Sequence, residues 1–303
     1  MTFATGGFHG LRYVPEVTFG TTPSTPAMVA LRHTECSLVL SKDSFQSNEL
    51  RSDRQISDLR HGIQSVGGSV GYEFSYGEFD PILEGALFST WNTNVLKAGV
   101  TSKFFTMERA FADITQYGVF TGCMVNGFSL SVQPNAIVTG SFDLIGKGAS
   151  YSGTPLDASV TDSQTNSPFD SFTGTIEEGG STIAIITGLE LNLANGLEAT
   201  QVVGSNTTPA IVPGRSNLTG TVSAYFENAT LLTKFIAETE SSIEFTLGNG
   251  TTKSYTFLIP RIKYSGGDNP ASGEGPIVIS MPFQALYDTS TATNIQITRI
   301  PGA

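Results

Sequence analysis

The chain has 303 residues, which is enough for one large domain or two of ordinary size. Only 14% of the residues are charged and the formal net charge is −11, so the chain lacks the positive balance of a protein that grips DNA. Residues 151–303 hold 14 of the 27 Asp and Glu but only 6 of the 16 Lys and Arg. This excess of acidic residues either serves solubility alone or forms an acidic surface that repels a polyanion.

The opening residues have neither the basic stretch nor the apolar stretch of a signal peptide. No apolar run approaches the length of a membrane span, so we expect no membrane segment. The two cysteines, Cys36 and Cys123, lie in apolar, strand-like contexts, where cysteine usually packs as a small hydrophobic residue. They favour a reducing compartment.

The first half alternates short apolar and polar runs, which is the pattern of half-buried strands. Residues 1–30 are punctuated by proline and glycine, so we expect an extended arm that needs a partner to become ordered. Asp80 is a candidate N-cap with Pro81 after it, which predicts a short helix over 80–88. Strands are expected at residues 35–40, 67–75, 103–109, 117–124, 125–132 and 137–144.

Residues 41–62 form a polar insertion in which both signs of charge are interleaved. The insertion exceeds what a tight hairpin needs, so it predicts a long loop. Such loops are usually functional, and contact with another subunit is the function we expect here. A flexible surface loop is the alternative.

The composition changes at residues 146–168, which are rich in Ser, Thr, Gly and Asp and poor in large apolar residues. We place a linker at 151–168, between a first domain at 1–150 and a second at 169–303. In the second half, strands are expected at residues 172–176, 181–193, 243–247, 253–257 and 295–300, with a loop at 265–276.

The two halves resemble each other at a long offset, which indicates a duplicated domain. The matched segments are 62–70 with 214–222, 38–40 with 191–193, 80–83 with 228–231, and 137–142 with 277–283 with one residue added. Phe74 falls on Phe226 in this alignment. The predicted fold is therefore all-β, with two tandem β-sandwich or partial-barrel domains and one short helix in each.

The sequence contains no catalytic motif that we could identify, neither a nucleophile elbow, a phosphate-binding loop, a dinucleotide fingerprint nor a zinc-protease helix. His9, His33 and His61 have no partner at metal-ligand spacing, and two distant cysteines do not make a zinc site. We expect neither an enzyme nor a cofactor.

Several stretches of the first half are similar to the corresponding region of the major tail tube proteins of long, non-contractile-tailed bacteriophages. They are residues 47–62, 66–70, 76–87, 122–130 and 138–143. The second half departs from that family, most clearly in the weaker charge of residues 194–214, its counterpart of the insertion.

The resemblance implies that inner sheets of neighbouring subunits join into one barrel around a lumen, that rings of six domains stack, and that DNA passes through without specific binding. Because the duplication gives each chain two such domains, three chains would complete a ring of six. The insertion would reach the adjacent ring through Glu49, Arg51, Asp53, Arg54, Asp58 and Arg60. Glu73 and Glu190 are the candidates for facing the lumen.

The partners that the resemblance implies are other copies of the chain, the tail tip or initiator, the tape measure and the terminator. The protein would lie in the virion tail after assembly in the host cytoplasm. A two-domain adhesin or carbohydrate-binding module is the alternative, although Trp91 is the only tryptophan available for stacking on a sugar. Tubes of contractile tails are usually single-domain hexamers, and the duplication argues against them.

Overall fold

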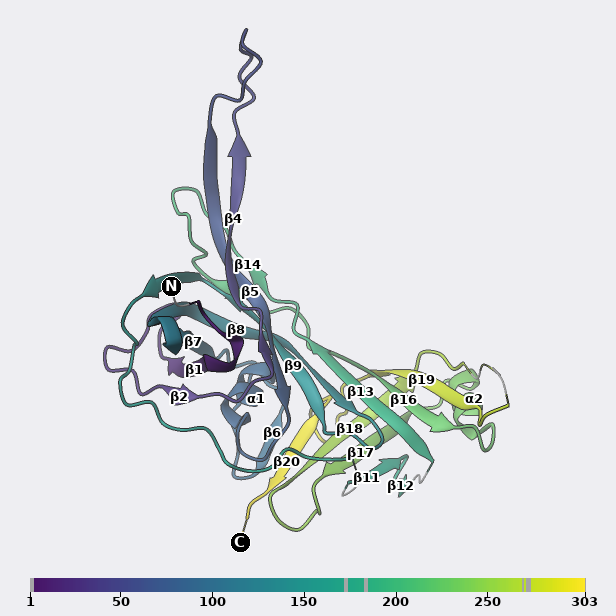
Figure 1. Cartoon of the computed structure of the whole chain (residues 1–303). Coiled ribbons are helices and arrows are strands. Elements are labelled where there is room, and N and C mark those ends of the chain that lie inside the picture. The colour runs from purple at the N-terminus through teal and green to yellow at the C-terminus, as the bar shows by residue number, and fades with distance from the viewer. Residues whose placement is uncertain (1–2, 172–173, 183–184, 269, 271–273, 303) are drawn as a thin grey trace.

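The computed structural model describes residues 3–171, 174–182, 185–268, 270 and 274–302. Figure 1 shows a rounded first half, a second half that extends to one side, and a long hairpin that projects away from both. The regular secondary structure is almost entirely antiparallel strand, with two short helices, α1 (Asp80–Ala86) and α2 (Thr230–Ile236). This confirms the predicted all-β class. None of the helices among the described residues is long and apolar enough to cross a membrane.

The first half contains two 3₁₀ turns, η1 (Gly6–Phe8) and η2 (Ala112–Ile114). Its strands are β1 (His9–Glu16), β2 (Val29–Ala30), β3 (Glu35–Cys36), β4 (Val39–Gln46), β5 (Leu59–Glu73), β6 (Val95–Lys97), β7 (Phe104–Phe111), β8 (Gln116–Val132), β9 (Thr139–Gly146) and β10 (Gly148–Ser152).

The strands of the second half are β11 (Thr175–Glu178), β12 (Ser181–Thr182), β13 (Ile186–Ala194), β14 (Glu198–Ala199), β15 (Ile211–Val212), β16 (Asn217–Tyr225), β17 (Ser241–Leu247), β18 (Ser254–Tyr264), β19 (Val278–Ala285) and β20 (Gln296–Ile300). The predicted hairpin over 172–193 includes residues 172–173 and 183–184, which lie outside the described residues.

One antiparallel sheet, which we call the central sheet, runs through both halves in the order β4, β5, β9, β8, β13, β16, β19. The halves join where β13 pairs with the end of β8, from Leu189 opposite Val132 to Ala194 opposite Gly127. The start of β8 pairs instead with β7 and β10 in a second layer. The length of β8 therefore lets one strand serve both layers of the sandwich.

Alternation along the strands explains which face of the central sheet is buried. Leu189, Leu191 and Leu193 in β13 are almost completely buried, and the residues between them are exposed. The buried side chains belong to a core that extends through both halves. Since side chains on a strand alternate between faces, the opposite face of the sheet is left polar and open to solvent.

Strand pairing repeats the topology of the first half in the second. The order β1, β7, β8, β9, β5, β4 corresponds to β11, β17, β18, β19, β16, β13, and one helix lies between matching strands in each copy. Val70 lies opposite Phe142, as Val222 lies opposite Met281. Phe142 therefore corresponds to Met281 rather than Phe283, and the extra residue in our sequence alignment was wrong.

The insertion at 41–62 is a paired hairpin at its base, over residues 41–46 and 59–62, and the predicted loop is confined to its tip. Ser44 lies opposite His61 and Gln46 opposite Leu59, so only residues 47–58 lie beyond the strands. The polar side chains hid these strands, because neither face of the hairpin is buried in the chain and the apolar alternation is absent. We call this projecting hairpin, residues 41–62, the arm.

The N-terminal residues also differ from the prediction, because β1 is a full member of the body. It pairs with β7 over its whole length, from His9 opposite Phe111 to Glu16 opposite Phe104. Pro15 is tolerated because β2 pairs with the other edge of β1 only at Arg12 and Tyr13.

The segment at 151–168 begins in β10 and then runs along the first half. Ala30 donates to the carbonyl of Thr161 at 2.9 Å, and Phe169 donates to that of Phe74 at 2.8 Å. The second-half counterpart of the arm, residues 194–214, folds back, and Gln64 of β5 donates to the carbonyl of Asn206 at 2.9 Å. The placement of a domain boundary within 151–168 stays a prediction.

Candidate functional site

The open face of the central sheet, which we call the polar face, is lined by short polar side chains that bond across strands. Ser41 and Ser65 hydroxyls lie 2.8 Å apart, and those of Ser129 and Ser141 lie 3.0 Å apart. At the far side, Gln284 Nε2 donates to Asn217 Oδ1 at 2.9 Å. The register at the junction, with Asn192 opposite Ser129, places these residues of both halves on one face.

The charges on this face are mostly negative. Glu73 and Glu190, the two predicted lumen candidates, both lie on it, together with Glu35 and Asp143. Partial burial raises the pKa of Asp143. No Lys or Arg occupies the polar face along β5 from Ser65 onward, or along β9, β13, β16 and β19, all of which are fully described. Lys263 lies opposite Gln284 where β18 borders the sheet.

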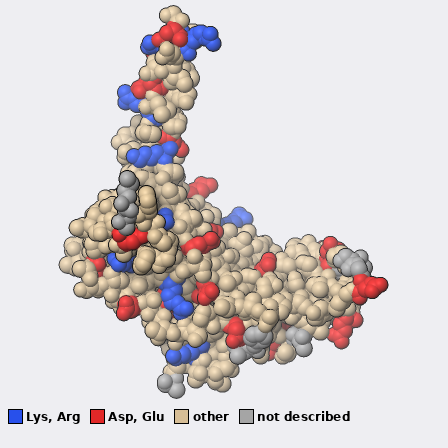
Figure 2. Space-filling model, in the orientation of Figure 1, with Lys and Arg blue, Asp and Glu red and all other residues tan. Residues whose placement is uncertain are grey.

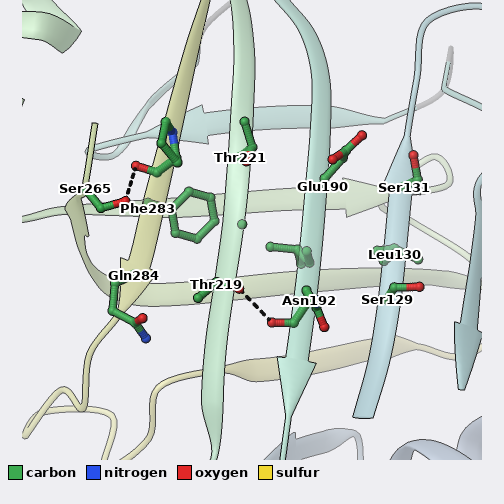
Figure 3. Close-up of a pocket in the computed structure, with 13 residues that line it drawn as sticks. Ser129, Leu130, Ser131, Glu190, Asn192, Thr219, Thr221, Ser265, Phe283 and Gln284 are labelled. Carbon is green, nitrogen blue, oxygen red and sulfur yellow. Dashed lines mark hydrogen bonds between the residues drawn. The ribbon is translucent and has the colours of Figure 1, made fainter. Parts of the chain in front are cut away.

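A shallow hollow of about 560 Å³ lies on the polar face across the junction of the two halves (Figure 3). Hydroxyl and amide side chains line it, and Glu190 is its only labelled carboxylate. Gln133 Nε2 donates to that carboxylate at 3.4 Å. The hollow presents these polar groups together with the apolar side chains of Pro282 and Phe283.

The arm carries all six residues predicted to contact another ring, and Figure 2 shows both signs of charge along its length. Arg51 Nη2 lies 2.8 Å from Asp53 Oδ2, and Arg60 Nε lies 3.2 Å from Asp58 Oδ2. The pair with Arg51 lowers the pKa of Asp53. Because these ion pairs are exposed and local, they add little to stability and leave the charges available to a partner.

A set of exposed apolar side chains on the same arm was not predicted from the sequence. Leu50 is 99% exposed, and Phe45, Ile56 and Leu59 are also exposed. Large exposed apolar groups that cluster within a polar rim are typical of protein interfaces. The signal was present in the sequence as four large apolar residues within an insertion that has no other reason to contain them.

Both outer edges of the central sheet are open among the described residues. At one edge, β3 and β4 pair only with β5. At the other, residues 265–268 continue beyond β18 along β19, where Ser265 donates to the carbonyl of Pro282 at 2.8 Å and Asp268 to that of Ser280 at 3.1 Å. Open edges of this kind are templates for pairing with another chain.

A half-buried polar cluster lies behind the β3–β4 edge. His9 Nδ1 and His33 Nε2 lie 2.8 Å apart, and Arg109 Nε donates to His9 Nε2 at 3.1 Å. Burial, with the charges of His33 and Arg109, lowers the pKa of His9 to about 4. Arg109 also donates to the carbonyl of Leu38 at 2.7 Å and so supports the edge. No group of three or more potential metal ligands occurs among the described residues.

A second polar cluster holds the two halves together. Asp80 of α1 accepts hydrogen bonds from the Tyr255 hydroxyl and from Arg299 Nη1, the latter at 2.5 Å. The guanidinium of Arg299 also lies over the Trp91 ring, 4.6 Å from its centroid. Asp80 was predicted as an N-cap, but Phe79 precedes the helix and Asp80 serves this cluster instead. Trp91 is therefore half-buried within the molecule and does not form an exposed platform for a sugar.

Comparison with known proteins gives a family match that extends over residues 9–285, to the family described as phage tail tube protein. One solved structure that resembles the chain is an extracellular contractile injection system, the PVC sheath/tube terminator in its extended state. It is 14% identical, with a TM-score of 0.36, over 45% of this chain and 99% of that one. No curated protein sequence matches the chain.

The family match confirms the resemblance found in the sequence. It covers both copies of the duplicated topology, including the second half, whose likeness was not evident from residues alone. The family is a structural one and not a class of enzyme. Since the match extends over most of the chain, this protein belongs to the phage tail tube protein family and is a structural component of the virion tail.

Proposed function

We propose that three chains form a closed ring of six tube domains, and that these rings stack into the tail tube. The observation that carries the proposal is the junction inside the chain, where β13 of the second copy pairs with β8 of the first. This junction joins equivalent domains edge to edge. The two open edges of the central sheet have the strands needed to repeat it between chains.

The strand equivalences define how the edges would meet. Leu38–Leu40 corresponds to Leu191–Leu193 of β13, because each set lies opposite the matching residues of β5 or β16. Asp268, which bonds Ser280, corresponds to Ser129, which lies opposite Ser141. Asn192 lies opposite Ser129 at the internal junction. In the ring, Val39 of one chain would therefore lie opposite Asp268 of the next.

Repetition of a head-to-tail contact that turns by a constant angle closes a ring and leaves no sheet edge exposed. The first copy supplies four neighbouring strands to the central sheet, and the second supplies β13, β16, β19 and the segment of residues 262–268 beside β19. Six copies would therefore form one continuous barrel. This arrangement places the polar face, with Glu73 and Glu190, toward the enclosed lumen. A carboxylate-rich wall gives DNA no counter-charge to hold, so double-stranded DNA passes without specific binding.

The arm would dock on the adjacent ring. Its charged residues, Glu49, Arg51, Asp53, Arg54, Asp58 and Arg60, would set orientation through complementary charge. Leu50 and the other exposed apolar side chains of the arm would supply the buried part of the contact. The tail tip or initiator, the terminator and the tape measure are the remaining partners, and assembly takes place in the host cytoplasm.

Cysteine crosslinking tests the ring directly. In the double variant Val39→Cys/Asp268→Cys, oxidation of the assembled protein should produce covalent dimers and trimers on a non-reducing gel, and electron microscopy should show end-on rings with six lobes. Val39→Cys with Ile236→Cys is the matched control, because Ile236 is equally accessible but lies on α2, away from the edge. Monomers alone from the first variant, with no rings at any concentration, would overturn the proposal.

A further inference from the structure

The segment before β11 fills a place in the first copy that stands open in the second. Phe169 forms an added strand beside the end of β5, donating to the carbonyl of Phe74 at 2.8 Å and accepting from the amide of Val138 at 2.9 Å. Its side chain is only 8% exposed and packs 5.8 Å from the Phe74 ring, between centroids. The first copy is therefore completed by residues that lead into the second.

The second copy repeats this site without its occupant. Phe226 corresponds to Phe74 and Ile277 to Val138, and the amide of Phe226 donates to the carbonyl of Ile277 at 2.9 Å, as Phe74 does to Val138 at 2.8 Å. Among the described residues, nothing donates to the Phe226 carbonyl and nothing accepts from the Ile277 amide. Ile277 is 37% exposed. No described residue therefore occupies the corresponding position beside this copy.

The duplication also identifies the segment that would fill this position. Leu11 lies opposite Arg109 as Ile176 lies opposite Phe245, so β1 begins the first copy as β11 begins the second. The counterpart of the segment before β11 is therefore the segment before β1. Phe169 lies seven residues before Ile176, and Phe3 lies eight residues before its counterpart Leu11. The one additional residue falls in the stretch that contains η1.

The N-terminal segment, residues 3–8, has the chemistry for this role. Phe3 is 76% exposed, although the backbone just after it is fixed where the Thr5 amide donates to Asp113 Oδ2 at 2.6 Å. A large aromatic side chain that is exposed on an ordered backbone is typical of a residue that packs against a partner. The position beside Phe226 offers an apolar surface and two backbone groups, the Phe226 carbonyl and the Ile277 amide, that bond to no described residue there.

We infer that the N-terminal segment of one chain adds a strand to the second copy of the neighbouring chain, with Phe3 packed against Phe226. The Phe3 amide donates to the Phe226 carbonyl, and the Ile277 amide donates to the Phe3 carbonyl. The inference rests on the proposed ring, since the ring places the first copy of each chain beside the second copy of the last. The segment then straps each chain to its neighbour outside the central sheet.

A second crosslink separates this inference from the ring itself. In Phe3→Cys/Ile277→Cys, oxidation of the assembled protein should give covalent dimers and trimers, whereas Phe3→Cys/Val203→Cys, whose second position is more exposed and lies on another hairpin, should not. Rings that form normally but never crosslink through the first pair would overturn the strap and leave the ring proposal intact. A crosslinked species of monomer mass would also overturn it, because the contact would then lie within one chain.

The variant Phe3→Ser provides a measure of the contact without cysteine. Losing one buried aromatic side chain should raise the protein concentration needed for half-maximal ring formation about tenfold or more. Val203→Ser, which removes an exposed apolar group elsewhere, is the control and should leave that concentration unchanged. Equal concentrations for Phe3→Ser and the parent protein would contradict the inference, while rings absent from the parent protein would instead contradict the proposed function.

Discussion

The cluster that joins the two copies predicts a large loss of stability when Arg299 is replaced by Met. The substitution keeps an apolar stem but removes the ion pair with Asp80 at 2.5 Å and the hydrogen bond to the Thr93 carbonyl at 3.1 Å. It also removes the cation that lies over the Trp91 ring. Asp80 keeps its bond from Tyr255 but loses its counter-charge in a largely buried site.

The expected magnitude follows from these contacts. A charge-assisted hydrogen bond contributes about 1.5–3 kcal/mol, and a partly exposed cation–π contact about 0.5–1 kcal/mol. Since the Arg299 side chain retains some exposure to solvent, we take the lower half of that range and expect a loss of about 2 kcal/mol in the free energy of unfolding. The loss should fall on the contact between copies rather than on the core of either one.

Urea denaturation of the monomeric form measures this, followed by tryptophan fluorescence, because Trp91 lies in the cluster. A double-mutant cycle with Asp80→Asn isolates the pair, and the two substitutions should be strongly non-additive. Arg261→Met is the matched control, since Arg261 pairs with Glu240 at an exposed site and its loss should cost little. A loss below about 0.5 kcal/mol for Arg299→Met, or full additivity with Asp80→Asn, would refute the reasoning.

Three further predictions follow from the arm, the histidine cluster and the duplication. Arg51→Glu with Arg54→Glu should spare rings but prevent their stacking, seen by electron microscopy; normal tubes would contradict the docking role. Folding lowers the pKa of His9 from 6.5 to about 4, so the folded state favours the neutral ring. The resulting contribution to the free energy of unfolding is complete above pH 6.5 and is lost as the pH falls toward 4. Between pH 7 and pH 5 the unfolding free energy should drop by about 1–2 kcal/mol, allowing for partial exposure, and His9→Gln should flatten that dependence. Deletion of residues 151–303 should leave a domain that cannot close a three-chain ring, and an unchanged trimer in sedimentation would count against the duplication argument.

Much of the fold could be predicted from local pattern. Leu189, Leu191 and Leu193 alternate with polar residues, and such alternation defines a strand and its buried face. Pro81 correctly placed the first turn of α1. Equivalent residues on matching strands indicated the duplication, because both copies bury them, as they do Val70 and Val222.

The features that were missed depend on contacts between distant residues. Glu16 is buried, yet its carboxylate accepts from Thr106 Oγ1 at 2.7 Å and from the Gly122 amide at 2.9 Å. Glu108 is buried and accepts from Arg12 Nη1 at 2.8 Å. The partners of both acids are distant in the sequence. The sequence around Glu16 and Glu108 therefore does not distinguish these buried acids from exposed ones. The strands of the arm were not predicted for a related reason, because they bury no face within the chain and so lack the apolar alternation.

The two copies differ at the junction between domains. This difference would make the junction inside a chain unlike the junction between chains in the proposed ring. Inside the chain, β20 of the second copy also pairs with β6 of the first, and the Asp80 cluster lies beside that pairing. β6 lies in the long stretch between α1 and β7, whereas α2 ends at Ile236 and β17 begins at Ser241. The second copy therefore has no room for a counterpart of β6.

It follows that a junction between chains would lack the β6–β20 pairing and its ionic cluster, and would depend on the sheet edge and the N-terminal segment. Fewer buried contacts at one junction than at the other make it the first to open. A ring built in this way separates into whole, folded chains before any chain separates into its two copies. That order suits a tube that grows by adding chains, because the unit that is added is the one with the stronger junction already formed inside it.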